Sequence, residues 1–189
     1  YRTLAFDTPA EVAAKVQTAK AATEGWRKVP LAERIETVRT ALDYFRTHET
    51  AIAESITTQM GKPITESHNE IAGLFERAGH MLSIADTILA PEILPVKGQL
   101  HRCIEREPLG VVLNIAAWNY PLLIAVNVVV PALVAGNSVL LKHSAKTPLC
   151  GEHFQAAFCH VPGIVTNLVL SHDQTFDLIR DARIDHVVF

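Results

Sequence analysis

The chain has 189 residues, of which 49% are hydrophobic and 20% charged, and its formal net charge is -3. This composition is typical of a globular protein with one sizeable core, and it argues against a nucleic-acid partner, which needs a basic face. The longest apolar stretch, residues 121–135, contains Asn127 and Pro131. It is shorter than the roughly 20 residues of a membrane span, so we expect a buried helix and no membrane partner.

The first half of the chain has the pattern of consecutive helices. Thr8-Pro9-Ala10-Glu11 is a capping box and predicts a helix start, and Pro30 predicts the start of a second helix. A third helix should end at Gly61, and a fourth should cover residues 65–90 before Pro91. We therefore interpret residues 1–95 as one helical segment.

The second half alternates between strands and helices. Residues 96–108 are expected to form a hairpin that turns near Lys97 and Gly98. The expected strands are residues 111–115, 138–141, 168–170 and 187–189, and the expected helices are residues 121–135, 148–158 and 174–181. These strands are apolar along their whole length, which is typical of strands buried on both faces of a parallel sheet.

The predicted fold is α/β, a Rossmann-like parallel sheet with helices on both faces, preceded by the helical segment. Ligands bind such sheets at the carboxyl ends of the strands, here residues 115–119, 141–145 and 170–173. The chain ends at Phe189 inside an expected strand, so we expect a fragment with an incomplete sheet.

Two polar side chains at this edge are candidates for chemistry. Asn119 offers a neutral amide donor that can stabilise an oxyanion, but it is also placed to cap the helix that follows. Lys142 ends the next strand and can bind ribose hydroxyls or a phosphate, or it is a surface lysine. The pattern alone favours the structural alternative for both residues.

Several segments carry a closer signal. Gly61-Lys62-Pro63 lies upstream, and the second half contains, in order, Leu109-Gly110-Val111-Val112, Trp118-Asn119-Tyr120-Pro121, the run from Pro131 to Lys142, and the run from Ile184 to Phe189. In order and spacing they closely resemble the aldehyde dehydrogenase superfamily. The last run is similar to the family's strand before a Phe-Thr-Gly-Ser loop. The resemblance extends over most of the chain, as the N-terminal, cofactor-binding portion of an NAD(P)-dependent enzyme that is succinate-semialdehyde-dehydrogenase-like.

The resemblance implies a role for each edge residue. Asn119 would be the oxyanion-hole amide for a tetrahedral intermediate formed from a small aldehyde substrate. The backbone of Ile115, Ala116 and Ala117 and the side chain of Trp118 would line the nicotinamide side of the cofactor groove. Lys142 would approach the adenine ribose. Residues 109–189 would thus be the βαβ cofactor-binding portion.

Three departures from the family pattern concern the cofactor. Many NAD-preferring members have Glu where this chain has Ala145, and a carboxylate there would repel a 2′-phosphate. Lys142 and Ser144 are then both candidates to contact that phosphate, so the cofactor is NAD or NADP and we expect NADP to be accepted. Ser171 and Thr175 stand where small glycines are common, which predicts a narrower adenine pocket. Ala117 replaces the common Pro before Trp118.

The expected reaction is oxidation of an aldehyde to a carboxylic acid by NAD(P)+. The family's nucleophilic Cys and general-base Glu lie after the Phe-Thr-Gly-Ser loop, so we predict that these 189 residues alone do not turn over aldehyde. Cys150 is a decoy: an early position in a helix would lower the pKa of its thiol, but a small buried side chain is the favoured interpretation. No metal site is expected from Cys150, His153, Cys159 and His160.

Two alternatives remain open at the level of sequence. One is a reductase of the same superfamily linked to an acyl phosphate or acyl-CoA, and the other is a non-catalytic binding or assembly module. The hairpin of residues 96–108 resembles the family's oligomerisation arm and implies a homodimer or homotetramer. Three cysteines without a Cys-x-x-Cys pair favour a reducing compartment, so we expect a cytoplasmic protein.

Overall fold

The computed structural model of the protein describes residues 2–189. Four helices come first: α1 (Pro9–Trp26), α2 (Leu31–Thr47), α3 (Glu49–Met60) and α4 (Ile64–Leu89). A hairpin of β1 (Glu92–Lys97) and β2 (Leu100–Ile104) follows. The remaining elements are β3 (Val111–Ala116), α5 (Pro121–Val134), β4 (Ser138–His143), α6 (Leu149–Ala157), β5 (Val165–Leu168), α7 (His172–Ile179) and β6 (His186–Val188).

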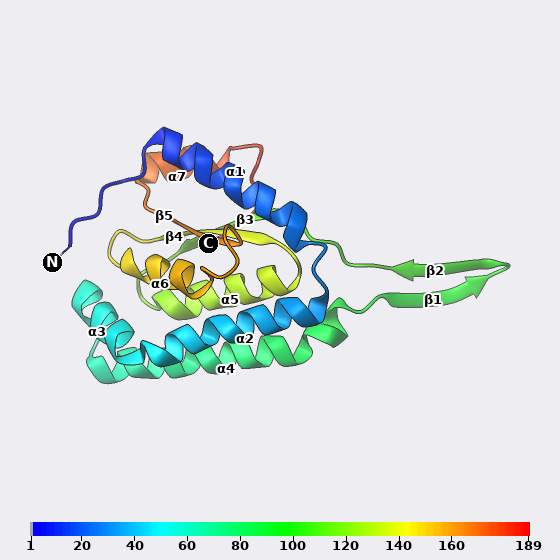
Figure 1. Ribbon diagram of the computed structural model, residues 1–189, viewed down its shortest axis with the longest axis horizontal. Helices are drawn as coiled ribbons and strands as arrows, with labels where there is room; N and C mark the ends of the chain where they lie inside the picture. The colour runs from blue at the N-terminus through cyan, green and yellow to red at the C-terminus, as the bar shows by residue number, and fades with distance from the viewer. Residues whose placement is uncertain (1) are drawn as a thin grey trace.

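The four strands β5-β4-β3-β6 form a parallel sheet in that order, which confirms the predicted α/β fold. Figure 1 shows α1 and α7 on one face of the sheet and α5 and α6 on the other, with α2 and α4 packed outside α5. All residues of β4 and β5 are buried, as strands covered on both faces should be. Within residues 2–189 no helix is both long and apolar enough to cross a bilayer.

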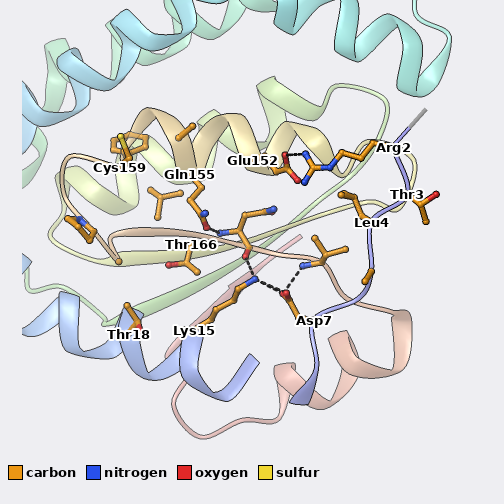
Figure 2. Close-up of a pocket in the computed structure, with 18 residues that line it drawn as sticks. Arg2, Thr3, Leu4, Asp7, Lys15, Thr18, Glu152, Gln155, Cys159 and Thr166 are labelled. Carbon is orange, nitrogen blue, oxygen red and sulfur yellow. Dashed lines mark hydrogen bonds and ion pairs between the residues drawn. The ribbon is translucent and has the colours of Figure 1, made fainter. Parts of the chain in front are cut away.

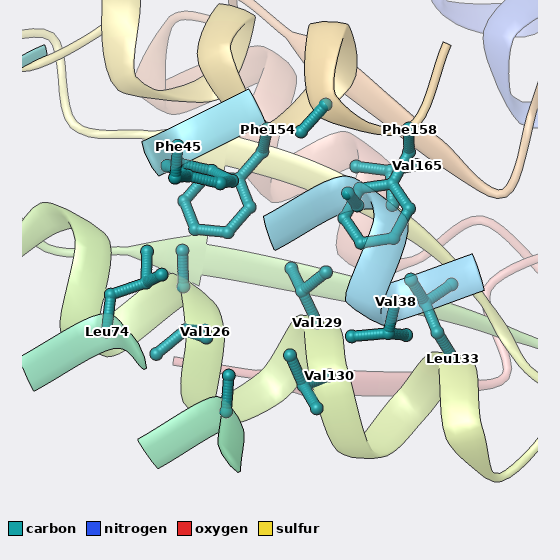
Figure 3. Packing of buried hydrophobic residues seen from close by; sticks show 14 of the residues in the cluster. Val38, Phe45, Leu74, Val126, Val129, Val130, Leu133, Phe154, Phe158 and Val165 are labelled. Atoms are coloured by element: carbon teal, nitrogen blue, oxygen red, sulfur yellow. The ribbon is translucent and has the colours of Figure 1, made fainter. Parts of the chain in front are cut away.

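The main core lies on the face of the sheet that α5 and α6 cover, and it continues to α2 and α4. Figure 3 shows Phe45 of α2 against Phe154 of α6, with ring centroids 5.0 Å apart, above Val126 and Val129 of α5. The buried valine and leucine side chains of α5 pack against α2 and α4 on one side and against β3 and β4 on the other. Burial of this apolar surface is the main contribution to holding the helical segment on the sheet.

The opposite face of the sheet is held by α1. Its capping box is confirmed, because the Thr8 hydroxyl accepts from the Glu11 amide and the Glu11 carboxylate accepts from the Thr8 amide. The Thr23 and Ser138 hydroxyls are hydrogen-bonded at 2.6 Å, and Trp26 Nε1 donates to the Leu133 carbonyl at 2.9 Å. These buried bonds tie α1 to the start of β4 and to the end of α5.

The hairpin projects away from the body of the molecule (Figure 1). Its turn lies at Gly98 and Gln99, but β1 begins at Glu92, so the expected start at residue 96 was wrong. The chain becomes extended directly after Pro91, and Pro95 is accepted because a two-stranded ribbon leaves half of its amides unpaired.

The strand expected at residues 168–170 was also misplaced, since β5 covers Val165–Leu168. Pairing with β4 decides the location: Val165 lies beside Val139 and Leu168 beside Lys142. The polar residues Thr166 and Asn167 hid the strand in the sequence. β5 is an edge strand of the sheet, and the backbone of Asn167 is bonded there by Lys15 and Gln155.

The last helix begins earlier than residue 174, at His172. The Ser171 hydroxyl accepts from the Gln174 amide, and the Gln174 side chain accepts from the Ser171 amide, which is a second capping box. The Ser-x-x-Gln signal was present in the sequence and predicts this start correctly.

Candidate functional site

The carboxyl ends of β3 and β4 lie side by side and are hydrogen-bonded to each other. The Ser144 amide donates to the Ala116 carbonyl at 2.9 Å, and Ile115 lies beside Lys142 in the register of the two strands. Ile115 is half-buried, Ala116 is buried, and Ala117 is exposed. The backbone therefore emerges from the sheet at Ala117, next to the end of β4.

A cation–π contact links the two loops that leave these strands. The Lys146 ammonium lies 4.2 Å from the centroid of the Trp118 ring. Trp118 remains 42% exposed. The indole thus presents a flat apolar surface at the edge of the sheet, with a positive charge beside it.

Lys142 is buried to 6% exposure at the same edge. Burial lowers the pKa of its ammonium because desolvation disfavours the charged form. Residues 142–146 carry Lys142 and Lys146 and no carboxylate, and Ala145 is exposed. The Ser144 hydroxyl accepts from the Lys146 amide at 3.3 Å. An anion placed here would meet positive charge and no opposing carboxylate from this loop.

Ser171 is the N-cap of α7 and Thr175 lies on that helix, which packs on the face of the sheet that also carries Leu140 and Leu168. Because side chains alternate along a strand, Lys142 lies on that same face. Their hydroxyls are already used within the helix. The Ser171 hydroxyl caps α7, and Thr175 Oγ1 donates to the Ser171 carbonyl at 2.6 Å.

Asn119 is exposed and lines a cavity of about 280 Å³ together with Gly61 and Lys62. The interpretation of Asn119 as a helix cap was wrong. The N-cap of α5 is Tyr120, and within residues 2–189 the Asn119 side chain makes no hydrogen bond. Its amide is therefore free to act on a group that enters the cavity.

The first turn of α5 is capped instead by Glu70 of α4. Glu70 Oε1 accepts from the Leu122 amide at 2.7 Å and from the Leu123 amide at 3.3 Å. Glu70 Oε2 is paired with Lys62, which lies 4.2 Å above the centroid of the Tyr120 ring. Sequence reasoning missed Glu70, although a carboxylate at a core-facing position of α4, beside Ile71 and before Leu74, is a usable signal.

The first turn of α6, the next crossover helix, is also capped by a side chain from the helical segment. Gln59 of α3 accepts from the Leu149 amide at 2.9 Å at the start of α6. In ordinary doubly wound folds, a dinucleotide diphosphate sits at the N-terminus of a crossover helix. Here α5 and α6 both have side chains of the helical segment at that place. Amides at the N-termini of both helices are therefore already hydrogen-bonded within the chain.

The three cysteines are free thiols, and Cys150 is not an activated one. Cys150 is fully buried, and burial together with the nearby Glu70 carboxylate raises its pKa to about 12. Desolvation outweighs any lowering by the helix N-terminus, which confirms the interpretation of Cys150 as a small core residue.

A further cavity, of about 890 Å³, lies elsewhere, along the edge strand β5. Figure 2 shows its charged side chains in pairs, with Lys15 on Asp7 and Arg2 on Glu152. Lys15 also donates to the Asn167 carbonyl and Gln155 accepts from its amide, so these side chains close the open edge of the sheet. Size alone does not make this cavity a functional site.

Comparison with known proteins identifies the family of the chain. Residues 2–189 match the model of the aldehyde dehydrogenase family. The chain belongs to this family. It is 32% identical to an aldehyde dehydrogenase of Paenarthrobacter nicotinovorans, with 97% of this chain and 41% of that protein covered. It is 34% identical to a succinate-semialdehyde dehydrogenase [NADP(+)] of Deinococcus radiodurans, with 89% of this chain and 36% of that protein covered.

Among solved structures, the fold is similar to succinic semialdehyde dehydrogenase from Streptococcus pyogenes in complex with NADP+. The TM-score is 0.91 at 27% identity, covering 99% of this chain and 42% of the other. This family member spans about two fifths of the length of the relatives it matches, 41% and 36% for the two enzymes above.

Proposed function

We propose that the protein containing this chain oxidises an aldehyde to a carboxylic acid with NADP+ or NAD+, and that these residues supply the cofactor surface and one oxyanion donor. The observation that carries the proposal is the joined carboxyl edge. There Ala116 and Lys142 lie at the ends of the paired strands β3 and β4, and the loop after β3 carries the Trp118 ring and the Asn119 amide, which has no hydrogen bond within residues 2–189.

Asn119 is the proposed oxyanion donor. Its amide is uncharged at every working pH, exposed, and free of internal hydrogen bonds to the rest of residues 2–189. A donor of this kind stabilises negative charge that develops on the aldehyde oxygen when a nucleophile adds to the carbonyl. Because no internal acceptor competes for the amide, no bond has to break before it can act.

The proposed cofactor surface comprises the backbone of Ile115, Ala116 and Ala117, the Trp118 ring and Lys142, with Ser144, Ala145, Ser171 and Thr175 around the ribose and adenine. The bound dinucleotide supplies a hydride acceptor. The loop of residues 142–146 fits a 2′-phosphate, because it offers positive charge and has Ala145 where a carboxylate would repel the anion. We infer that NADP is bound at least as tightly as NAD.

The substrate is proposed to be a small aldehyde, and succinate semialdehyde is the first to test, since two similar enzymes act on it by name. The nucleophile and the general base are proposed to lie outside these residues. Cys150 is excluded by its burial and raised pKa, and Cys103 lies on the projecting hairpin. Exposed free thiols at Cys103 and Cys159 agree with a cytoplasmic location.

The hairpin is the proposed contact between subunits of a homodimer or homotetramer. A lone two-stranded ribbon is marginally stable in water, and this one exposes Ile93, Val96 and Leu100 at 58–78%. Exposed apolar side chains on a projecting ribbon are typical of a surface that is buried on assembly.

The proposal is tested with the full-length protein, succinate semialdehyde, and NADP+ or NAD+ in separate titrations. Formation of reduced cofactor together with one equivalent of succinate is the expected result, with NADP+ bound at least as tightly as NAD+. Formation of an acyl-CoA or acyl phosphate in place of the free acid would identify a different reaction of the family. No reduced cofactor with any aldehyde of a chain-length series would contradict the proposal.

A further inference from the structure

A buried ion pair lies directly behind the loop that carries Asn119. The side chain of Glu70 is fully buried and that of Lys62 is 8% exposed. Lys62 leads from the Gly61 turn into α4, and Glu70 lies about two helical turns further on, so the pair spans the first part of that helix. On the far side, Glu70 reaches the amides of Leu122 and Leu123 in α5.

Stability alone is a poor reason for such a pair. Taking two charges out of water costs several kcal/mol per ion, and a well-packed apolar pair of similar size is often equally stable or more so. The carboxylate here has a more specific use, because it accepts three hydrogen bonds and two of them come from the first turn of α5. Three donors on one buried carboxylate define its position and that of the α5 N-terminus together.

The turn from Ala117 to Tyr120 has few other anchors. At one end the Ala116 carbonyl is held by the Ser144 amide, and Trp118 is in contact with Lys146 at the surface. At the other end, Tyr120 is the N-cap of α5, but its side chain makes no capping hydrogen bond to the helix. Its ring lies against the Lys62 ammonium. Asn119 has no hydrogen bond of its own to another part of residues 2–189. Its direction is therefore set by what holds the residues on either side.

We propose that Glu70 and Lys62 are positioning residues that orient the Asn119 amide toward the cavity it shares with Lys62. The inference rests on the proposed function, because it assigns a catalytic consequence to the place of Asn119. Glu70 binds the backbone just after the turn, and Lys62 fixes both the second oxygen of Glu70 and the ring of Tyr120. Neither residue has to touch the reacting atoms.

The first test measures the turn itself in the full-length protein. Glu70→Gln keeps the shape of the side chain and removes its charge, and Glu76→Gln is the matched control on the exposed face of the same helix. Hydrogen–deuterium exchange is followed on the peptide that contains Leu122 and Leu123. Faster exchange in Glu70→Gln and unchanged exchange in Glu76→Gln are expected. Equal exchange in both variants would overturn the inference.

The second test is a double-mutant cycle on kcat with Asn119→Ala. Misplacement of a catalytic group by about 1 Å can cost about 100-fold, so Glu70→Gln alone is expected to lower kcat by about 10- to 100-fold. In the Asn119→Ala background, Glu70→Gln should change kcat by less than about twofold, because coupled residues are not additive. The Kd for NADP+ should stay unchanged in every variant.

The outcomes separate the inference from the function it rests on. Additive losses in the cycle, or an equal loss in Glu76→Gln, would mean that Glu70 acts on stability in general, and the inference would fail while Asn119 keeps its role. If Asn119→Ala leaves kcat unchanged, the proposed role of Asn119 fails. If Glu70→Gln nevertheless speeds exchange, Glu70 anchors the start of α5 without any effect on catalysis. That result would overturn the inference that Glu70 positions Asn119 as a donor.

Discussion

Cys150 shows how burial decides the chemistry of a single residue. It lies in the first turn of α6, where a helix N-terminus favours a thiolate, yet it is fully buried beside Glu70 and its pKa is raised to about 12. The Cys150 Sγ accepts from Gln59 Nε2 at 3.9 Å, which is the one hydrogen bond of the thiol within the described residues. A thiol in these surroundings is a core side chain.

Alkylation of the native protein with iodoacetamide tests this environment. Peptide mapping by mass spectrometry should find Cys159 modified, because it is exposed and lies outside the hairpin, and Cys150 modified only after denaturation. Raising the pH from 7 to 9 should not change the result for Cys150, since its pKa lies well above that range. Rapid labelling of Cys150 in the native state would contradict the burial described here.

His143 is a second buried titratable group, and it opposes folding at low pH. Its ring is buried on the α5–α6 face of the sheet, stacks on Phe154, and has no hydrogen-bond partner for either nitrogen within residues 2–189. Burial, and then the charge of Lys142, lower its pKa to about 3. The folded protein therefore holds this imidazole in its neutral form.

The free energy of unfolding should depend on pH through His143. Above about pH 6.5 the ring is neutral in both states, and as pH falls below that value the unfolded chain takes up a proton that the folded chain refuses. Stability is thus fully present above pH 6.5 and lost toward pH 3, by about 1.4 kcal/mol per pH unit from this group. Urea unfolding at pH 7 and pH 5 measures this loss.

The matched variants for that measurement are His143→Leu and His80→Leu, the latter on the exposed face of α4. His143→Leu should reduce the loss of stability between pH 7 and pH 5, and it should fold normally because no hydrogen bond is removed. His80→Leu should leave the loss unchanged. An identical pH dependence in wild type and His143→Leu would show that His143 is not the group responsible.

At the scale of elements, α6 approaches the sheet closely at Gly151. A Cβ at this position would overlap Asn167 Oδ1 of β5 and would lie 3.1 Å from the His143 ring. Gly151→Ala is therefore expected to destabilise the protein by about 1–3 kcal/mol through overpacking. Gly79→Ala on α4 has open space around it and should instead stabilise by about 0.5–1 kcal/mol. Denaturant midpoints of the two variants should move in opposite directions, and parallel shifts would contradict this packing.

Local signals in the sequence predicted most of the elements correctly. The Thr8 capping box, Gly61 after α3 and Pro91 after α4 each act within a few residues, so their effect can be read without the fold. The polar strand β5 was misplaced because its location depends on pairing with β4, which no local pattern records. The apolar run of Val169 and Leu170 attracted the prediction instead.

In the candidate site, too, features with a local signal were predicted and a feature set by a distant contact was missed. Asn119 and Lys142 were predicted as site residues because they lie at or just after the ends of apolar strands within a recognisable pattern. The cap of α5 was assigned to Asn119 because a local cap was the simplest choice, whereas the real cap, Glu70, lies 52 residues away from Leu122. The cap of α5 comes from a residue that is distant in sequence. Such a contact can be identified only from the three-dimensional structure.

At the scale of the whole molecule, the hairpin is the feature that the isolated chain does not explain. It lies at the opposite end of the molecule from the N-terminal segment (Figure 1) and exposes Ile93 and Leu100. If it joins subunits, replacing both residues with Lys should reduce the molar mass measured by light scattering, with the circular dichroism spectrum unchanged. Phe6→Lys, a similarly exposed apolar residue far from the hairpin, is the control. An unchanged mass in the hairpin variant would contradict the assembly role.

The Asn119 amide is the proposed oxyanion donor, and the kcat of Asn119→Ala in the full-length protein measures its contribution to catalysis. Asn127→Ala, on the exposed part of α5, is the matched control. Loss of one oxyanion donor predicts a fall in kcat of about 100- to 1,000-fold, with cofactor binding and the Asn127→Ala variant unaffected. A kcat for Asn119→Ala within about twofold of wild type would show that Asn119 is not an oxyanion donor, because the expected loss exceeds that range many times over.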